Sequence, residues 1–222
     1  MILEIEIFVK QGKQPIGFDY HKKLHGWLSN LLGNDCYGKN VNDYTYSYIA
    51  RPMYKKDGIH LKDKKGSFVV RTSNPNVLCN FLNNYDKHKD DEMFYGVYPD
   101  GFKFLQIGNV NKGRFRTMVH SPILVNGLYD KKDWFDDNDI KRCEEYLVDS
   151  VFKKAKASGF TADENLSIKI KNQKKHSDIV YSGVHNKGRV FDLEINCNEE
   201  TKEFILLNGL GRSCGIGFGM IY

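Results

Sequence analysis

The 222-residue sequence has no run of 18 apolar residues, which is about the length that an α-helix needs to cross a membrane. Residues 1–7 alternate apolar and acidic side chains and lack the basic and apolar regions of a signal peptide. The five cysteines are odd in number, lie far apart and form no Cys-x-x-Cys pair, so neither a disulfide framework nor a zinc knuckle is predicted. We therefore expect a cytoplasmic protein that does not interact with a membrane.

Charge and hydrophobicity exclude further classes. Hydrophobic residues make up 41% of the chain and charged residues 27%, which is typical of a globular protein and not of a disordered tail or a collagen-like repeat. The net charge is +5, and residues 1–115 carry all of it, with 17 basic and 12 acidic side chains. An anionic partner is expected to bind mainly to this half. The alternative is an ordinary soluble surface.

The hydrophobic pattern predicts one order of elements twice. The first half has a strand at 1–10, a helix at 19–32, strands at 44–48 and 67–72, a helix from 74 to 85, and a hairpin of 94–98 and 102–107 around Pro99-Asp100-Gly101. The second half has a strand stretch at 114–125, a helix at 133–158, a strand at 166–170, a hairpin of 179–182 and 190–195 turned near Asn186-Lys187-Gly188, a helix at 199–207 and a last strand at 217–221. This order predicts an α+β fold of two tandem ferredoxin-like (βαββαβ, RRM-like) domains, 1–112 and 113–222.

Six glycines lie among residues 209–219, between the last predicted helix and the last strand. The order helix, glycines, strand excludes both a Walker loop and a Rossmann fingerprint. Glycines let a backbone approach a ligand closely, and an arginine fork fits phosphate. The alternative is a tight connection that closes a sheet edge. The residues of this glycine-rich loop that we expect to contact an anionic ligand are Gly209, Gly211, Arg212, Ser213, Gly217 and Gly219.

The loop has the pattern G-φ-G, five residues, G-φ-G, and in a two-domain ferredoxin-like chain this resembles the RAMP superfamily of CRISPR-associated proteins. More narrowly, it resembles the CRISPR repeat-processing endoribonucleases, which mature CRISPR RNA. Two other segments are similar to that family: Tyr44-Thr45-Tyr46-Ser47 to its aromatic-Thr-aromatic-Ser strand, and residues 115–125, with His120 inside, to its Thr-x-Ser-Pro strand. The resemblance extends over nearly the whole chain, and the glycine loop is its most specific part.

The resemblance implies a metal-independent cut in each CRISPR repeat of a precursor transcript, without a cofactor. The ribose 2′-OH attacks the adjacent phosphate and leaves a 2′,3′-cyclic phosphate and a 5′-OH. Such a site needs a proton acceptor, a proton donor and positive charge, and no His, Asp and Glu cluster has metal-ligand spacing. The implied partners are CRISPR repeat RNA, as precursor and mature product, and other CRISPR-associated effector subunits, with the protein as a monomer or homodimer.

The choice among seven histidines rests on a departure from the family. Many members of the family carry a catalytic histidine just after the first helix, but residues 33–40 of this chain contain none. In one branch of the family an aromatic residue followed three positions later by a histidine opens this helix, and Phe18 and His21 resemble that arrangement. We therefore expect His21 as general base or acid and His25, one turn away, as the second histidine. Residues beside them complete the expected site, with Tyr20 as a partner and Lys22 and Lys23 contacting RNA.

Other interpretations stay open at this point. His21 and His25 also fit as packing residues at the edge of the core stripe, and His120 fits as a strand residue. Four histidines lie in polar, lysine-rich segments, where solvation is the default: His60, His88, His176 and His185. The missing linker histidine favours a second function, a non-catalytic RNA-binding RAMP subunit of an effector complex. A third is an unrelated protein of the same fold that binds a small molecule.

Overall fold

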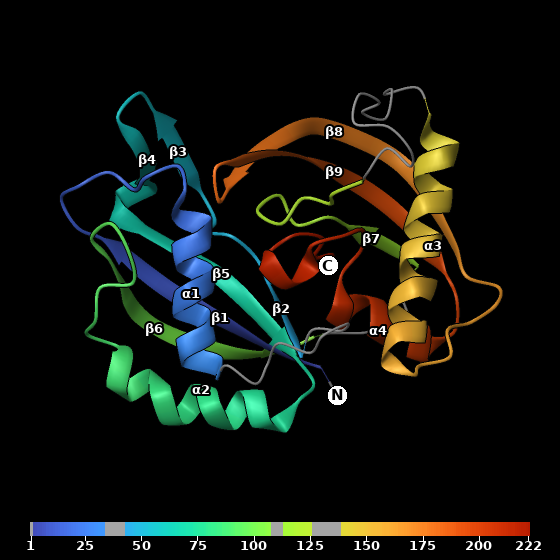
Figure 1. The fold of residues 1–222 in the computed structure, drawn as a ribbon, viewed down its shortest axis with the longest axis horizontal. Coiled ribbons are helices and arrows are strands. Elements are labelled where there is room, and N and C mark those ends of the chain that lie inside the picture. The colour runs from blue at the N-terminus through green and yellow to red at the C-terminus, as the bar shows by residue number, and fades with distance from the viewer. Residues whose placement is uncertain (1, 34–42, 108–112, 126–138) are drawn as a thin grey trace.

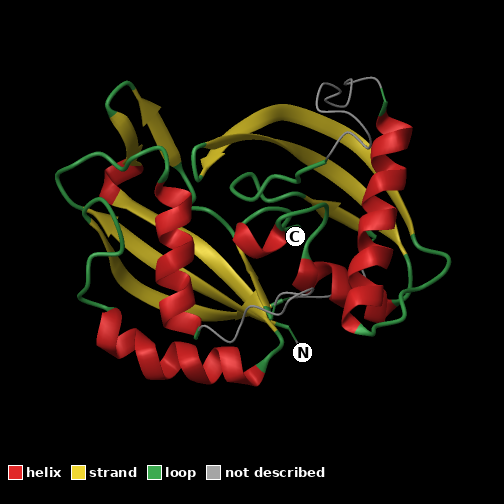
Figure 2. Cartoon of the chain, in the orientation of Figure 1, coloured by secondary structure: helices red, strands yellow, loops and turns green. Residues whose placement is uncertain are grey.

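The structure is a computed structural model, and it describes residues 2–33, 43–107, 113–125 and 139–222. It has an α+β fold of two ferredoxin-like halves, each with an antiparallel sheet and its own pair of helices (Figure 1). Figure 2 shows the two sheets with the C-terminal segment between them. No helix in these ranges is long and apolar enough to cross a membrane.

The first half contains a four-stranded sheet in the order β2-β5-β1-β6. Its main elements are β1 (Leu3–Gln11), α1 (Tyr20–Leu32), β2 (Tyr44–Tyr46), β5 (Lys65–Thr72), α2 (Pro75–His88) and β6 (Val97–Gln106). Alternate residues of β1 are buried against the two helices, as the period of its sequence predicts. A separate hairpin of β3 (Pro52–Lys55) and β4 (Gly58–Leu61), followed by the short 3-10 helix Lys62–Lys64, is inserted before β5.

The second half contains a three-stranded sheet in the order β7-β9-β8. Its elements are β7 (Arg114–Arg116), α3 (Ile140–Ser158), β8 (Ser167–Tyr181), β9 (Val184–Asn196), α4 (Glu199–Asn208) and the 3-10 helix η3 (Cys214–Ile216). The end of the chain extends this sheet beside β7. Arg116 and Tyr222 exchange both backbone hydrogen bonds, each at 2.9 Å, and Thr117 pairs with Ile221. The predicted α+β fold of two ferredoxin-like halves is thereby confirmed, whereas the predicted last strand at 217–221 is reduced to the bridge at Ile221.

The predicted hairpin around Pro99-Asp100-Gly101 is wrong. Residues 97–106 form one continuous strand, and this tripeptide lies at a bulge, where the register with β1 shifts between Ile7 and Val9. Gly101, at a φ of 110°, supplies the backbone angle that the bulge needs. The chain reverses earlier, where Tyr95 and Gly96 have φ angles of 46° and 66° and Phe94 bridges to Val97.

The second predicted hairpin has the wrong turn. Strands β8 and β9 turn at Ser182-Gly183, where both φ angles are positive (51° and 77°), as a two-residue hairpin turn requires. Asn186-Lys187-Gly188 lies inside β9 instead. The predicted strand 114–125 shortens to β7, and the predicted helix start at 133–138 falls outside the described residues. The β3–β4 hairpin was not predicted.

The core consists of two clusters that exchange residues between the halves. Phe218, from the glycine loop, and Ile179, from β8, are buried in the cluster of the first half. In return, Ile2 is buried in the cluster of the second half. The predicted boundary between residues 112 and 113 adjoins 108–112, which lie outside the described residues, so it stays a prediction. The halves therefore fold against each other, and the glycine loop lies where they meet.

Candidate functional site

The histidines at the start of α1 lie where three other segments meet. Val180 and Tyr181, at the tip of β8, contact the face of α1 that carries His21 and His25. The end of β2 supplies Tyr46, and the residues after it supply Tyr48. The glycine loop closes the group through η3, next to β2 and α1. We call His21, His25, Tyr46, Tyr48 and Tyr181 the histidine–tyrosine cluster.

His21 is buried, with 4% of its surface exposed. Its Nδ1 lies 3.0 Å from the Val180 carbonyl oxygen, and its ring lies between Tyr20 and Tyr48, with centroid distances of 4.0 and 4.2 Å. Burial lowers the pKa of His21 to about 4, although carbonyl contacts with Val180 and Phe18 act in the opposite direction. The ring is therefore neutral at pH 7. Because a carbonyl only accepts hydrogen bonds, Nδ1 carries the proton and Nε2 the lone pair.

His25 is half-buried one turn further along α1. Its Nδ1 lies 3.0 Å from the Tyr46 hydroxyl, and its ring centroid is 6.3 Å from that of Tyr181. Burial lowers its pKa from the usual value. The hydroxyl both donates and accepts, so this contact leaves either tautomer of His25 open. His25 is more accessible than His21, because its ring is only half-buried.

Tyr20 is buried, and its ring stacks on Phe94 at a centroid distance of 5.5 Å. Burial, with Tyr54 nearby, raises the pKa of Tyr20. Its phenol is thus held protonated, and the ring packs directly beside His21. Lys22 and Lys23 are exposed on the other side of the helix start, and the Lys23 Nζ lies 4.9 Å from the centroid of Tyr95.

Tyr48 connects His21 to the glycine loop, and sequence analysis did not single it out. Its hydroxyl donates to the Ile216 carbonyl at 2.7 Å, and its ring packs edge-on against Phe218. A Cβ atom added at Gly217 would lie 2.5 Å from the Tyr48 ring. The signal was present, because Tyr48 continues the alternation of Tyr44 and Tyr46 beyond the matched tetrapeptide.

The glycines are required by the packing of the loop itself. Gly209, Gly211, Gly217 and Gly219 all have positive φ angles, between 67° and 99°. A Cβ at Gly211 would lie 2.5 Å from the Leu124 carbonyl oxygen, and one at Gly219 would collide with the Leu210 carbonyl. The tight-connection alternative thus accounts for these four positions. Arg212 is exposed and Ser213 is partly exposed, so these two polar side chains of the loop are accessible from solvent.

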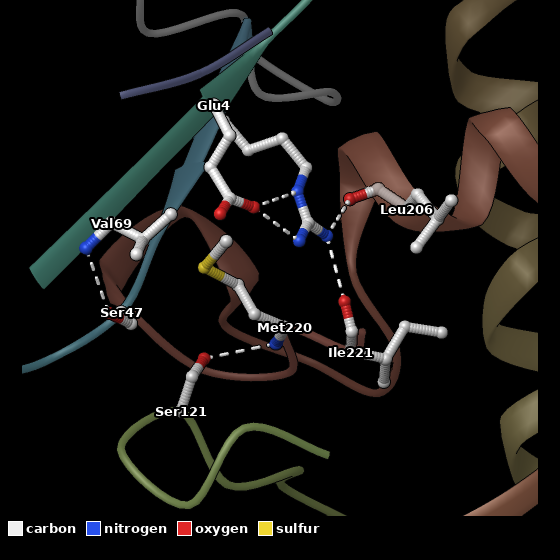
Figure 3. Close-up of polar contacts among 8 residues, drawn as sticks. Glu4, Ser47, Val69, Ser121, Leu206, Met220 and Ile221 are labelled. Carbon is white, nitrogen blue, oxygen red and sulfur yellow. Dashed lines mark hydrogen bonds and ion pairs between the residues drawn. The ribbon is translucent and has the colours of Figure 1, made fainter. Parts of the chain in front are cut away.

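Ser121 and Lys154 lie outside the glycine loop and bind it through hydrogen bonds of their side chains. Sequence analysis did not identify either residue as part of the site. The Ser121 hydroxyl donates to the Gly217 carbonyl at 2.7 Å and accepts from the Met220 N–H at 3.0 Å, the second of which Figure 3 shows. The Lys154 Nζ lies 2.8 Å from the Gly209 carbonyl oxygen and 3.1 Å from the Cys214 sulfur. Ser121 belongs to the Ser-Pro pair of the resemblance, which was the signal for it.

Arg71 on β5 fastens both ends of the loop to the first sheet. It is 1% exposed, and its Nη2 lies 2.8 Å from a Glu4 carboxylate oxygen. Its Nη1 donates to the carbonyls of Leu206 at 3.0 Å and Ile221 at 2.9 Å, which lie before and after the glycine loop. Figure 3 shows Glu4, Leu206 and Ile221 around this group. The clamp of Arg71 and Glu4 therefore fixes the loop relative to the sheet that carries the cluster.

The remaining histidines differ in their surroundings. His120 is half-buried, and its carbonyl accepts from the Tyr48 N–H at 2.8 Å, so it directly adjoins the cluster. His60 and His88 pair with Asp57 and Asp91 on the surface, and His185 is exposed. The His176 side chain lies outside the described residues. No group of three His, Cys, Asp or Glu side chains in the described part of the chain is placed to hold a metal ion.

Comparison with known families and structures gives consistent results. The family model described as CRISPR associated protein Cas6, C-terminal, matches residues 106–222, more than half of the chain. No curated protein sequence matches.

Two solved structures resemble the fold over nearly its full length. One is a Cas6-related protein from Pyrococcus furiosus, 17% identical, with a TM-score of 0.81 and coverage of 100% of this chain and 98% of that one. The other is a RAMP protein that binds different RNA substrates, 18% identical, with a TM-score of 0.80 and coverage of 99% and 98%. A third, the CRISPR RNA processing endoribonuclease Cas6b, is 17% identical, with a TM-score of 0.52 and coverage of 100% and 98%. At these identities the similarity establishes the fold.

Proposed function

Because the chain belongs to the Cas6 family of CRISPR-associated proteins, we propose that it is an endoribonuclease that cuts CRISPR repeat RNA in the precursor transcript. The observation that carries this proposal is His21: a neutral histidine, with its tautomer fixed by Val180, beside a glycine loop that Tyr48 and Arg71 hold in place. The similarity of the fold to an RNA-processing endoribonuclease and to an RNA-binding RAMP protein supports it.

The reaction uses a nucleophile that the RNA itself provides. The Nε2 lone pair of His21 accepts the proton of the ribose 2′-OH, and the oxygen forms a bond to the adjacent phosphorus. The bond from phosphorus to the 5′-oxygen breaks, which leaves a 2′,3′-cyclic phosphate and, after protonation of the leaving oxygen, a 5′-OH. No metal takes part in these steps.

His25 is the proposed proton donor, because it lies one turn from His21 and is only half-buried. A lowered pKa for each histidine places the optimum on the acid side of neutrality. His21 accepts protons only above a pH of about 4, whereas His25 donates best below its own pKa. The exposed cations Arg212, Lys22 and Lys23 are proposed to contact phosphates.

The test is cleavage of a labelled CRISPR repeat RNA in the presence of EDTA. Wild type should cut it and leave a cyclic phosphate. His21→Asn keeps a donor for the Val180 carbonyl but lacks Nε2, so the rate should fall by roughly 10²–10⁴-fold. His88→Asn, on the far surface, is the matched control. Cleavage that requires a divalent metal, or full activity in His21→Asn with loss in His25→Ala or His120→Ala, contradicts this assignment.

One observation favours a second function, RNA binding without cleavage. His21 is 4% exposed, and this burial separates its ring from a substrate. A RAMP protein that binds different RNA substrates also shares the fold. A repeat RNA that binds tightly but is recovered intact after long incubation across pH 5 to 8 would support this function over the enzyme.

A further inference from the structure

The β3–β4 hairpin and the turn after it carry most of the excess charge of the protein. Residues 51–65 contain six basic and two acidic side chains, which gives +4 of the total of +5. All six basic side chains are exposed: Arg51, Lys55, Lys56, Lys62, Lys64 and Lys65. In the described residues none of the six forms an ion pair with a carboxylate, and Asp57 is paired with His60 instead. The positive charge of this segment is thus available to a partner.

The hairpin also exposes large apolar side chains. Tyr54 is 61% exposed and Met53 is 39% exposed, although both lie within β3. An exposed aromatic residue beside unpaired lysines is the combination that binds single-stranded nucleic acid, because bases stack on the ring while lysines contact phosphates. Arg51 and Lys64, which flank the hairpin, have positive φ angles of 62° and 58°. Such angles are unfavourable for residues other than glycine and are often found at functional sites.

The hairpin lies beside the candidate site. Ile59 of β4 pairs with Ile16, four residues before α1, by two backbone hydrogen bonds of 2.8 Å. Tyr54 faces Ile59 across the hairpin and lies close enough to Tyr20 to affect its pKa. The Tyr20 ring packs against His21, so the Tyr20 side chain lies between Tyr54 and His21. In Figure 1 the hairpin lies at the end of the molecule where α1 begins, opposite α2.

We propose that the β3–β4 hairpin is a docking surface for the single-stranded RNA that continues from the segment cut at His21. Tyr54 stacks on a base, and Lys55 and Lys56 at the hairpin tip contact phosphates. These contacts are independent of sequence, since every base has a face that stacks and every nucleotide a phosphate. This inference rests on the proposed function. It adds that the bound RNA includes the segment that flanks the repeat.

The experiment compares three RNAs with a 2′-deoxy block at the cleavage position: the repeat alone, and the repeat with ten uridines added on the 5′ or the 3′ side. Dissociation constants are measured by fluorescence anisotropy between 50 and 200 mM KCl. For wild type, one of the two flanks should raise affinity by roughly tenfold. Lys55→Gln/Lys56→Gln should remove this increase, leave binding of the repeat alone unchanged, and lower the salt slope by about 1.4, for two single-strand phosphate contacts.

Two further variants separate stacking from charge and from folding. Tyr54→Ala should lower the gain in affinity from the uridine flank roughly fivefold or more, and Tyr54→Phe should restore that gain. Lys87→Gln/Lys89→Gln removes the same charge from exposed positions around the end of α2, at the far end of the first half, and should change nothing.

The proposal is overturned if neither flank raises the affinity of wild type. It is also overturned if Lys55→Gln/Lys56→Gln weakens binding of the repeat alone as much as that of the extended RNA, or behaves like the α2 control. Cleavage of the unblocked repeat is measured separately. A gain in affinity from the flank without cleavage supports the docking surface and contradicts the proposed enzyme. Cleavage without a gain in affinity supports the enzyme and contradicts the docking surface.

Discussion

The two halves share one order of elements but complete their sheets differently. The sheet of the first half has four strands, of which β1 and β6 contain 9 and 10 residues and the edge strand β2 contains three. In the described residues, the sheet of the second half has three strands, and the last residues of the chain occupy a fourth position beside β7. The difference arises in the glycine loop. Residues that would lengthen the last strand instead turn toward the first half, where Phe218 is buried in the core.

This difference shows how a repeated fold can bring residues of both halves together at one candidate site. The last strand of the second half stays short, and the glycine loop instead extends to Tyr48. The Tyr48 ring in turn packs against His21. The loop then depends on contacts from the first half. Arg71 binds both of its ends, and Tyr48 binds its middle. If this interpretation is right, changes at these contacts should affect stability and the site together.

The largest expected effect is at Arg71. Arg71→Met leaves the Glu4 carboxylate in a largely buried position without its partner, and it also removes donors from the Leu206 and Ile221 carbonyls. Removing one partner of a buried ion pair costs about 3–5 kcal/mol. Urea unfolding at pH 7 should show this loss, and RNA affinity should fall because the loop loses its anchor.

The control for Arg71 is a surface pair. Lys89 and Asp86 on the first half are at least half exposed and lie 3.3 Å apart. Lys89→Met should therefore cost less than about 1 kcal/mol. Equal losses in the two variants would show that the halves do not depend on the Arg71 clamp.

The next effect concerns pH. The pKa of His21 is about 4 in the folded protein and about 6.5 when unfolded, so between these values the unfolded state binds more protons. Stability therefore rises with pH from 4 to 6.5, and acidification to pH 4 costs about 3 kcal/mol through this group. Urea unfolding at several pH values should show a steeper acid loss in wild type than in His21→Asn. Parallel curves would mean that His21 is not buried as described.

A smaller effect is expected at Gly217. Gly217→Ala places a Cβ 2.5 Å from the Tyr48 ring at a φ of 99° and should cost about 2 kcal/mol. Gly159, which ends α3 at a φ of 71°, has no atom within 4 Å of an added Cβ, so Gly159→Ala should cost only about 1 kcal/mol. Thermal unfolding compares the two. An equal loss would show that the loop does not depend on close contact with the first half.

Much of the fold could be predicted because periodicity reports local structure. The 3.6-residue pattern of α1 and the alternation of β1 both lie within single elements. The errors occurred where residues that favour a turn also fit inside a strand. Pro99-Asp100-Gly101 favours a turn, but pairing with β1 keeps it inside β6 as a bulge. The polar residues of β8 between 170 and 179 carry no strand pattern, yet pairing with β9 makes them part of one strand.

The site could be predicted only in part, because it depends on contacts between distant segments. The resemblance drew attention to His21, His25 and the glycine loop, and the structure brings His21 next to a tyrosine that binds the loop. No local pattern indicates that Arg71 reaches Leu206 and Ile221, which are 135 and 150 residues away. The sequence around His21 left open whether this side chain packs in the core or acts at a site, because its burial depends on the distant residues Val180 and Tyr48.

The smallest effect is expected at Arg212, and it tests whether the loop has a role beyond packing. Arg212 is exposed, and its backbone N–H, rather than its side chain, pairs with Leu124. Arg212→Ala should therefore leave the free energy of unfolding unchanged within about 0.5 kcal/mol. If its guanidinium contacts one phosphate, binding of the repeat RNA weakens and the slope of log Kd against log salt falls by about 0.7. Lys156→Ala, which removes a charge near the end of α3, should leave that slope unchanged. A loss of stability in Arg212→Ala with an unchanged slope would mean that all of the loop, including this side chain, serves only to join the two halves.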